Sequence, residues 1–152
     1  MLHVTTTAFA DGTPIPGRFA AGGENLSPPL AWEGVPAGTK SLALITDDPD
    51  APRGTWTHWV LYNLPADAHG LAQGVPKNAV LPNGAHQGIN SGNAVGYDGP
   101  QPPPGKAHHY HFKVYALDTT LDLPPRATKA QLEQAMQGHV LAEGEVMGTF
   151  AR

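Results

Sequence analysis

The chain has 152 residues, a formal net charge of −4 and no cysteine. This length suits one domain with a substantial core, placed at residues 1–152, and the missing cysteines exclude disulfides, thiolate metal ligands and a cysteine nucleophile. The acidic balance without a basic patch argues against nucleic acid as a partner. No apolar stretch reaches membrane-spanning length and the first residues do not resemble a signal peptide, so we expect no membrane span and a cytoplasmic location.

The first half of the chain contains two strand candidates separated by a long loop. Residues 2–9 alternate loosely between apolar and polar side chains, which indicates a first strand. Residues 12–39 are rich in proline and glycine and are predicted to be loop, with Leu30 and Trp32 turned inward. The apolar run SLALIT at residues 41–46 has the length of a buried strand and is too short for a helix.

A further strand is predicted at residues 55–64 (TWTHWVLYNL), which are rich in β-branched and aromatic residues. Alternation would place four of its side chains on one face: Trp56, His58, Val60 and Tyr62. Residues 65–95 are rich in turn residues, with a short strand expected near residues 84–87.

Residues 96–117 join a rigid loop to a strand. The loop contains four prolines, which fix φ and remove backbone donors: Pro100, Pro102, Pro103 and Pro104. In the strand that follows, alternation separates two faces. One face carries His108, Tyr110, Phe112 and Val114, and the other carries His109, His111, Lys113 and Tyr115.

One helix is predicted near residues 128–137, opened by a capping box between Thr128 and Gln131 and closed at Gly138. A closing strand follows, in which Gly144 and Gly148 mark bulges or points of close approach. About six to eight strands with one helix, and no alternation of strands and helices, predict a mostly β fold: an antiparallel β-sandwich.

Polar side chains gather where the predicted strands begin and end. His58 and His108 come from different segments, and their N–H groups together with the Tyr110 hydroxyl could bind an oxyanion. Asp48 and Asp50 would repel an anion unless a carboxylate bound to one imidazole nitrogen fixes the tautomer and aims the other N–H at the ligand. A carboxylate could instead accept the ammonium group of an aminoalkyl phosphate.

Each of these residues also has a structural interpretation. Either histidine, taken singly, could satisfy core or loop hydrogen bonds, and both aspartates could cap backbone amides beside proline. Trp56 could be core or pocket wall. The bond between Ala51 and Pro52 lies in a tight acidic loop and is a candidate cis peptide.

Two other chemistries stay open. His58 with Asp48 or Asp50 would form the general-base pair of a small hydrolase, although no serine lies in a G-x-S-x-G motif. His109 and His111 could ligate a metal from one strand face, but zinc needs three or four ligands and no third is marked by spacing. We therefore expect no catalytic residue, no metal and no cofactor.

Three motifs are specific in combination: DPDAP at residues 48–52, GTWTHW at residues 54–59, and the proline-rich loop followed by HHY within residues 99–110. Together they resemble the phosphatidylethanolamine-binding protein family, in its short bacterial Raf-kinase-inhibitor-like branch. SPPLAW at residues 27–32 and EGEVMGTF at residues 143–150 also look like that branch, so the resemblance covers nearly the whole chain.

The resemblance implies a Greek-key β-sandwich with a small pocket at one end, which accepts phosphate-like anions and phospholipid head groups such as phosphorylethanolamine. Carried over position by position, its ligand-binding residues are Asp48, Asp50, Pro52, Trp56, His58, Pro102, His108 and Tyr110. The chain departs from the family at His109, a position that is often arginine.

The resemblance also implies a regulator or inhibitor of a protein partner, a kinase or a serine protease, and a homodimer. A third interpretation places inhibition in an exposed loop, residues 98–105 or 84–96, with a purely structural pocket.

Overall fold

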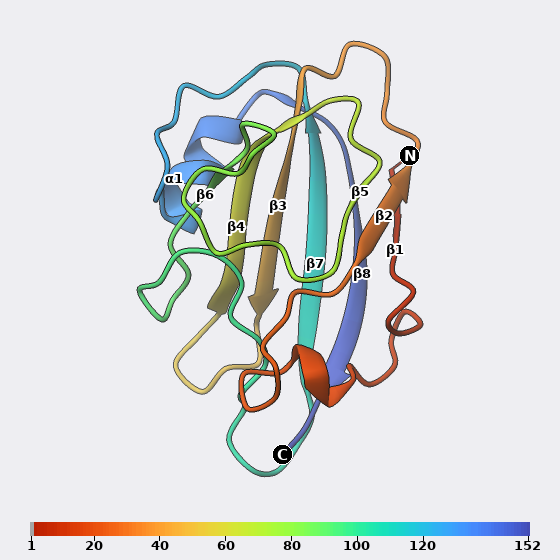
Figure 1. The fold of residues 1–152 in the computed structure, drawn as a ribbon, viewed down its shortest axis with the longest axis vertical. Helices are drawn as coiled ribbons and strands as arrows, with labels where there is room; N and C mark the ends of the chain where they lie inside the picture. Colours follow the sequence, from red (N-terminus) through yellow and green to blue (C-terminus); the bar gives the residue numbers. More distant parts are fainter. Residues whose placement is uncertain (1) are drawn as a thin grey trace.

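The computed structural model describes residues 2–152 and shows two antiparallel sheets packed face to face (Figure 1). The larger sheet has five strands, in the order β6 (His86–Gln87), β4 (Trp56–Pro65), β3 (Ser41–Asp48), β7 (His108–Leu117) and β8 (Val140–Phe150). The smaller sheet has three, in the order β1 (His3–Thr5), β2 (Leu30–Glu33) and β5 (Gly70–Leu71). All neighbouring strands are antiparallel, so the predicted sandwich is confirmed.

Strand β3 lies at the centre of the larger sheet, and all eight of its residues are buried. Leu42 and Leu44 pack between the sheets, whereas Ala43 and Ile45 pack on the outer face. Both faces of the strand are therefore covered, which explains why its sequence is a continuous apolar run instead of an alternating one.

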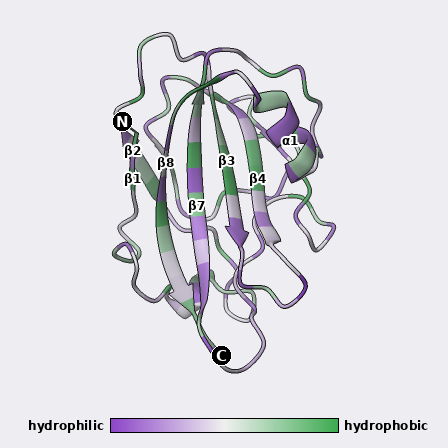
Figure 2. Cartoon of the chain, turned by 180° about the vertical axis from the view of Figure 1, so that it is seen from behind, coloured by the Kyte–Doolittle hydropathy of each residue, from purple (hydrophilic) through white to green (hydrophobic). Residues whose placement is uncertain are grey.

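The outer face is covered by helix α1 (Lys129–Met136), which begins as predicted. The Thr128 hydroxyl accepts the Gln131 backbone N–H at 3.2 Å, and the Gln131 side chain accepts the Thr128 N–H at 2.9 Å. Leu132 packs toward β4, beside which α1 lies in Figure 2. Gly138 follows with a φ of 81°, as the left-handed end of a helix requires. Within residues 2–152 no helix is long and apolar enough to cross a bilayer.

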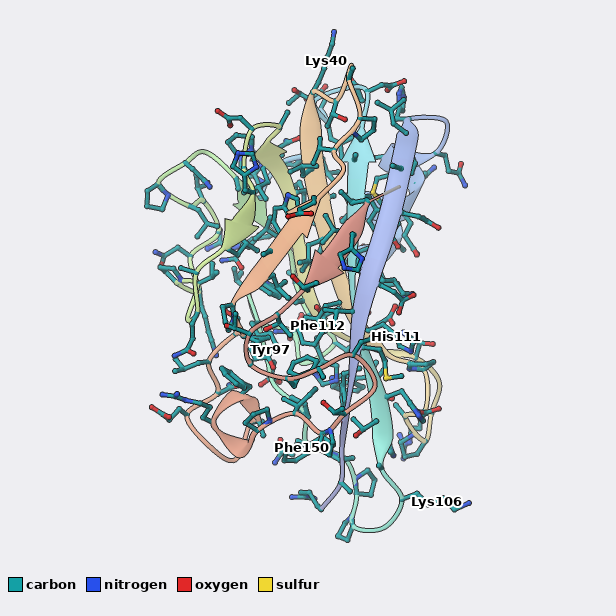
Figure 3. The ribbon with its side chains drawn as sticks, turned by 90° about the vertical axis from the view of Figure 1, so that its right-hand side faces the viewer. Lys40, Tyr97, Lys106, His111, Phe112 and Phe150 are labelled. Carbon is teal, nitrogen blue, oxygen red and sulfur yellow. The ribbon has the colours of Figure 1, made fainter. Side chains whose placement is uncertain are left out.

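Strand β7 alternates as predicted, with Tyr110, Phe112 and Val114 buried between the sheets. Its other face is polar, and Figure 2 shows the change of hydropathy along it. Tyr97, in the loop before β7, is buried against Phe112 with ring centroids 6.5 Å apart (Figure 3). Its hydroxyl donates to the Phe19 carbonyl at 2.8 Å, so the loop before β7 belongs to the core.

Three local predictions are wrong. The region predicted as loop contains β2, a strand of four residues that alternate between buried and exposed. The two prolines directly before it indicated a loop, so this short strand was not recognised in the sequence. The first strand is limited to His3–Thr5 instead of residues 2–9. The Ala51–Pro52 bond is trans, because residues 2–152 contain no cis peptide. The acidic turn closes instead through the Asp50 N–H, which donates to Asp48 Oδ1 at 2.8 Å.

The predicted close approaches at Gly144 and Gly148 are confirmed. A methyl group at Gly148 would lie 2.5 Å from Ile15 Cγ1 and 2.7 Å from Phe9 Cε1, and one at Gly144 would lie 2.2 Å from the Leu2 carbonyl oxygen. Strand β8 is therefore held tightly against the N-terminal segment by the absence of side chains at these two positions.

We expect Gly148→Ala to destabilise the protein by about 1–3 kcal/mol, because the added methyl group overpacks the contact with Ile15 and Phe9. Gly22→Ala is the matched control, since nothing lies within 4 Å of the new methyl group, and it should change stability by less than about 0.5 kcal/mol. Urea unfolding of both variants measures the difference. Equal stabilities would show that β8 moves away from the N-terminal segment without cost.

Candidate functional site

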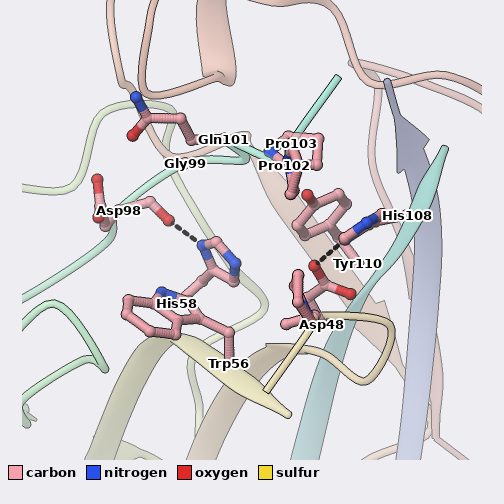
Figure 4. A pocket seen from close by; sticks show the side chains of 12 residues that line it. Asp48, Trp56, His58, Asp98, Gly99, Gln101, Pro102, Pro103, His108 and Tyr110 are labelled. Atoms are coloured by element: carbon pink, nitrogen blue, oxygen red, sulfur yellow. Dashed lines mark hydrogen bonds and ion pairs between the residues drawn. The ribbon is translucent and has the colours of Figure 1, made fainter. Parts of the chain in front are cut away.

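A pocket lies at the end of the sandwich where β3 ends and β4 and β7 begin. These ends meet because β3 is antiparallel to both neighbours, and residues 98–103 form the opposite wall (Figure 4). The cavity has a volume of about 210 Å³, below the range of about 300–1,000 Å³ that is usual for drug-sized ligands, and suits a head group. Its lining residues are Asp48, Ala51, Pro52, Trp56, His58, Asp98, Gly99, Gln101, Pro102, Pro103, His108 and Tyr110.

A β-bulge in β4 turns His58 toward this pocket. Thr57 and Trp59 pair with consecutive residues of β3, which leaves His58 as the extra residue. His58 then lies against Tyr110 of the inner core, whereas Val60 packs on the outer face with α1. The predicted single face of Trp56, His58, Val60 and Tyr62 is therefore wrong, because alternation does not continue through a bulge.

His58 is bound to Asp98 in both directions. Its Nδ1–H donates to the Asp98 carbonyl at 2.6 Å, and the Asp98 backbone N–H donates to the His58 carbonyl at 2.9 Å. The ring stands edge-on to Tyr110 at 5.2 Å between centroids, and the residue is only 5% exposed. Burial lowers the pKa of His58 more than the Asp98 hydrogen bond and the nearby Asp48 carboxylate raise it, so the ring is neutral at pH 7.

His108 is held by a carboxylate. Its Nδ1–H donates to Asp48 Oδ2 at 2.7 Å, and Asp48 is only 3% exposed. The predicted carboxylate that orients an imidazole is therefore found at His108. The general-base pair predicted between His58 and Asp48 or Asp50 is not formed, because His58 Nδ1 is bound to a backbone carbonyl.

Tyr110 and Trp56 complete the polar and aromatic parts of the wall. Burial, together with the Asp48 carboxylate, raises the pKa of Tyr110, so its hydroxyl keeps its proton and can donate. Trp56 is 43% exposed and lines the pocket at its rim, which decides between the two roles that the sequence left open for it.

The loop that carries Asp98 is held by Asn25, a residue far away in the sequence. The Asn25 amide donates to Asp98 Oδ1 at 3.2 Å and accepts the Gly99 backbone N–H at 2.7 Å. Ala21 also donates its N–H to the Pro100 carbonyl at 3.0 Å. The wall opposite the histidines is therefore fixed by hydrogen bonds as well as by its prolines.

Seven of the eight predicted ligand-binding residues line the pocket. Asp50 does not: its carboxylate lies outside, where it accepts the side-chain and backbone N–H groups of His109 at 2.7 and 2.9 Å, and these bonds lower the pKa of Asp50. Sequence reasoning missed five lining residues: Ala51, Asp98, Gly99, Gln101 and Pro103. Asp98 contributes its backbone carbonyl, which no side-chain pattern reveals.

The outer face of β7 holds the histidines that suggested a metal. His109 is bound to Asp50 and His111 to Glu145. Among residues 2–152 no group of three or more histidines, cysteines, aspartates or glutamates has the arrangement to hold a metal ion. Each of the two histidines is therefore paired with an acidic side chain on this face.

The fold and site together define an antiparallel β-sandwich with a polar pocket at one end. Residues 5–151 match the family model for phosphatidylethanolamine-binding protein, and the chain belongs to this family. A UPF0098 protein of Methanothermobacter thermautotrophicus is 52% identical over 151 residues, which are 99% of each chain.

Two solved structures support the same conclusion. Escherichia coli YbcL, described as a member of the mammalian PEBP family, superposes with a TM-score of 0.93 at 34% identity, over 99% of this chain and 98% of that one. CT736 of Chlamydia trachomatis, described as a PEBP homologue, superposes with a TM-score of 0.90 at 40% identity, over 99% of this chain and 97% of that one.

We expect acid to destabilise the protein partly through His58. The pKa of His58 is lowered in the folded state, so the unfolded chain binds more protons once the pH falls below the ordinary value of 6.5. The His58 contribution to stability is complete above this pH and is lost as the pH falls toward the folded pKa. Urea unfolding at pH 7 and pH 5 should therefore show a smaller acid-induced loss in His58→Gln than in the wild type.

The matched control for this experiment is His86→Gln, because His86 Nδ1 also contacts a backbone carbonyl, that of Leu123 at 3.1 Å, outside the pocket. An acid-induced loss that is the same in His58→Gln and the wild type would show that burial does not disfavour the charged ring of His58.

Proposed function

We propose that this protein binds a small phosphate-type anion, such as the phosphorylethanolamine head group, in the pocket at the end of the sandwich. The observation that supports this most strongly is the convergence of His58, His108 and the Tyr110 hydroxyl on one small cavity. Both rings have Nδ1 bound to the protein, so their orientations are fixed before a ligand arrives. A rigid wall that carries three groups able to form hydrogen bonds with the oxygens of a ligand can hold a compact oxyanion.

The acidic residues do not contradict an anion site, because each is bound to a partner. Asp48 accepts from His108, and Asp50 accepts from His109 outside the pocket. Asp47 points to the outer face, where it contacts Lys129 at 3.0 Å and Lys113 at 3.4 Å. The remaining oxygen lone pairs of Asp48 could also accept the ammonium group of an aminoalkyl phosphate.

We further propose that ligand binding serves regulation, with the protein acting as a cytoplasmic homodimer that modulates a kinase or a serine protease. The rigid, proline-rich wall at residues 98–105 is the surface that such a partner would meet beside the ligand. Inhibition of the partner that survives His58→Ala would assign it to this loop instead of the pocket.

A small hydrolase is the second candidate, and the bonded pair of His108 and Asp48 is the observation that favours it. In that function His108 would activate a water molecule for attack on the bound ester. Turnover of p-nitrophenyl phosphate that disappears in His108→Ala would support the enzyme, and its absence at high protein concentration would exclude it for this ester class.

We expect O-phosphorylethanolamine to raise the melting temperature of the wild type in a saturable way. A ligand at about 100 times its dissociation constant stabilises the folded state by about 2.7 kcal/mol, which corresponds to several degrees for a domain of this size. His58→Ala and His108→Ala should each weaken binding by about 10- to 100-fold, because each removes a hydrogen bond to a charged ligand.

His139→Ala is the matched control for His108→Ala, since His139 forms the same type of pair with Asp118 at 2.8 Å, outside the pocket lining. A wild type that shows no shift with any phosphate, or a control that loses as much affinity as the pocket variants, would contradict the proposed site.

The two aspartates of the DPDAP turn should differ in their effects. Asp48→Asn replaces the ionised acceptor that fixes His108 and should weaken O-phosphorylethanolamine binding by about tenfold or more. Asp50→Asn alters a contact that lies outside the pocket and should leave binding within about twofold. Calorimetric titration of both variants tests this, and equal losses would place Asp50 in the binding machinery.

A further inference from the structure

The hydrogen bond between His58 and Asp98 determines which tautomer His58 adopts. A carbonyl oxygen can only accept, so the Nδ1 that lies 2.6 Å from it must carry a proton. In a neutral imidazole the other nitrogen, Nε2, then has a lone pair and no hydrogen. Among residues 2–152 the His58 ring forms its hydrogen bond through Nδ1, and Nε2 faces the cavity in Figure 4. The neutral ring therefore offers the ligand an acceptor instead of a donor.

The surroundings of His58 keep the ring neutral. The residue is 5% exposed, and among residues 2–152 the hydrogen-bond partner of its ring is an uncharged carbonyl. The charged or titratable groups that face it are Asp48, Asp47, Asp98, Tyr110 and, across the same pocket, His108. Each of the three carboxylates already has another partner. Asp48 accepts a hydrogen bond from His108, and Asp98 accepts one from Asn25. Asp47 forms ion pairs with Lys113 and Lys129. Charging His58 would therefore place a cation in a buried site without a carboxylate of its own.

We infer that His58 Nε2 is an obligate hydrogen-bond acceptor, so that the pocket selects a phosphate that still carries a proton, namely the monoanion of a phosphomonoester. This inference rests on the proposed anion-binding function and specifies its ligand. The P–OH group of the ligand donates to His58 Nε2, while the Tyr110 hydroxyl donates to a phosphoryl oxygen. A fully deprotonated phosphate would instead bring an oxygen lone pair against the lone pair of Nε2.

Selection of a protonated phosphate distinguishes two sources of the ligand, an intact phospholipid and a free phosphomonoester. An intact phospholipid is a phosphodiester and has no P–OH group, whereas free phosphorylethanolamine is a monoester whose second pKa is about 6 and which keeps that proton in part of its population near neutral pH. Both share the phosphorylethanolamine chemistry. The tautomer of His58 favours the free monoester over the lipid head group.

The test compares three small anions that carry the same single charge at pH 5.5: methyl phosphate, dimethyl phosphate and methyl sulfate. Only methyl phosphate carries an acidic hydrogen. We expect calorimetric titration of the wild type to show that methyl phosphate binds at least about tenfold more tightly than the other two anions. Neither of those can donate a hydrogen bond, so His58 Nε2 is left without a partner when they bind. Methyl sulfate has no extra methyl group, so it separates the missing proton from a steric effect.

A second arm identifies the source by comparing O-phosphorylethanolamine with glycerophosphorylethanolamine, the soluble diester head group. Tighter binding of the monoester is expected. His58→Gln offers an amide that can donate or accept, so its preference for methyl phosphate over methyl sulfate should shrink, while His86→Gln keeps the wild-type preference. If His58→Gln does not fold, the ¹⁵N shifts of the wild-type imidazole report the same point, because Nε2 should stay unprotonated in the complex with methyl phosphate.

The outcomes separate the two proposals. Equal affinity for all three anions, or a doubly protonated His58 ring in the complex, would overturn the inference while leaving the anion site in place. No binding of any anion would overturn the proposed function and the inference together.

Discussion

The reciprocal pair of hydrogen bonds between His58 and Asp98 is the contact on which the pocket depends. It joins the bulge of β4 to the loop before β7, residues separated by 40 positions. Asn25 holds the far side of the same loop through the Asp98 carboxylate and the Gly99 N–H. The pocket wall is therefore assembled from three distant segments, and a change in any one of them would release the orientation of the His58 ring.

The acidic turn after β3 shows how alternation distributes charge. Asp47 and Asp48 are consecutive, so their side chains point to opposite faces of the sheet. Asp47 reaches Lys113 and Lys129 on the outer face, and Asp48 reaches His108 on the inner face. Two buried carboxylates can thus end a buried strand because each finds a partner on its own side.

The sequence predicted what local rules determine. The alternation of β7, the capping box at Thr128 and the buried run of β3 each depend on residues that are close in the chain. The bulge at His58 was not predictable in this way, because it exists only relative to the pairing of β4 with β3. The Asp98 carbonyl was missed for a related reason: backbone atoms carry no residue type, so their role appears only when the loop is folded.

The two histidines of the pocket are not equivalent, and the difference follows from what holds each ring. The backbone carbonyl that holds His58 is uncharged and can only accept, so the neutral ring presents Nε2 to the cavity as an acceptor. The group that holds His108 is the buried Asp48 carboxylate, which fixes the orientation of that ring. A carboxylate therefore lies beside the cavity at His108, whereas none is bound to His58 Nδ1. Because repulsion by Asp48 grows with each further negative charge on the ligand, this arrangement agrees with the acceptor at His58 in favouring an anion that is singly charged and still protonated.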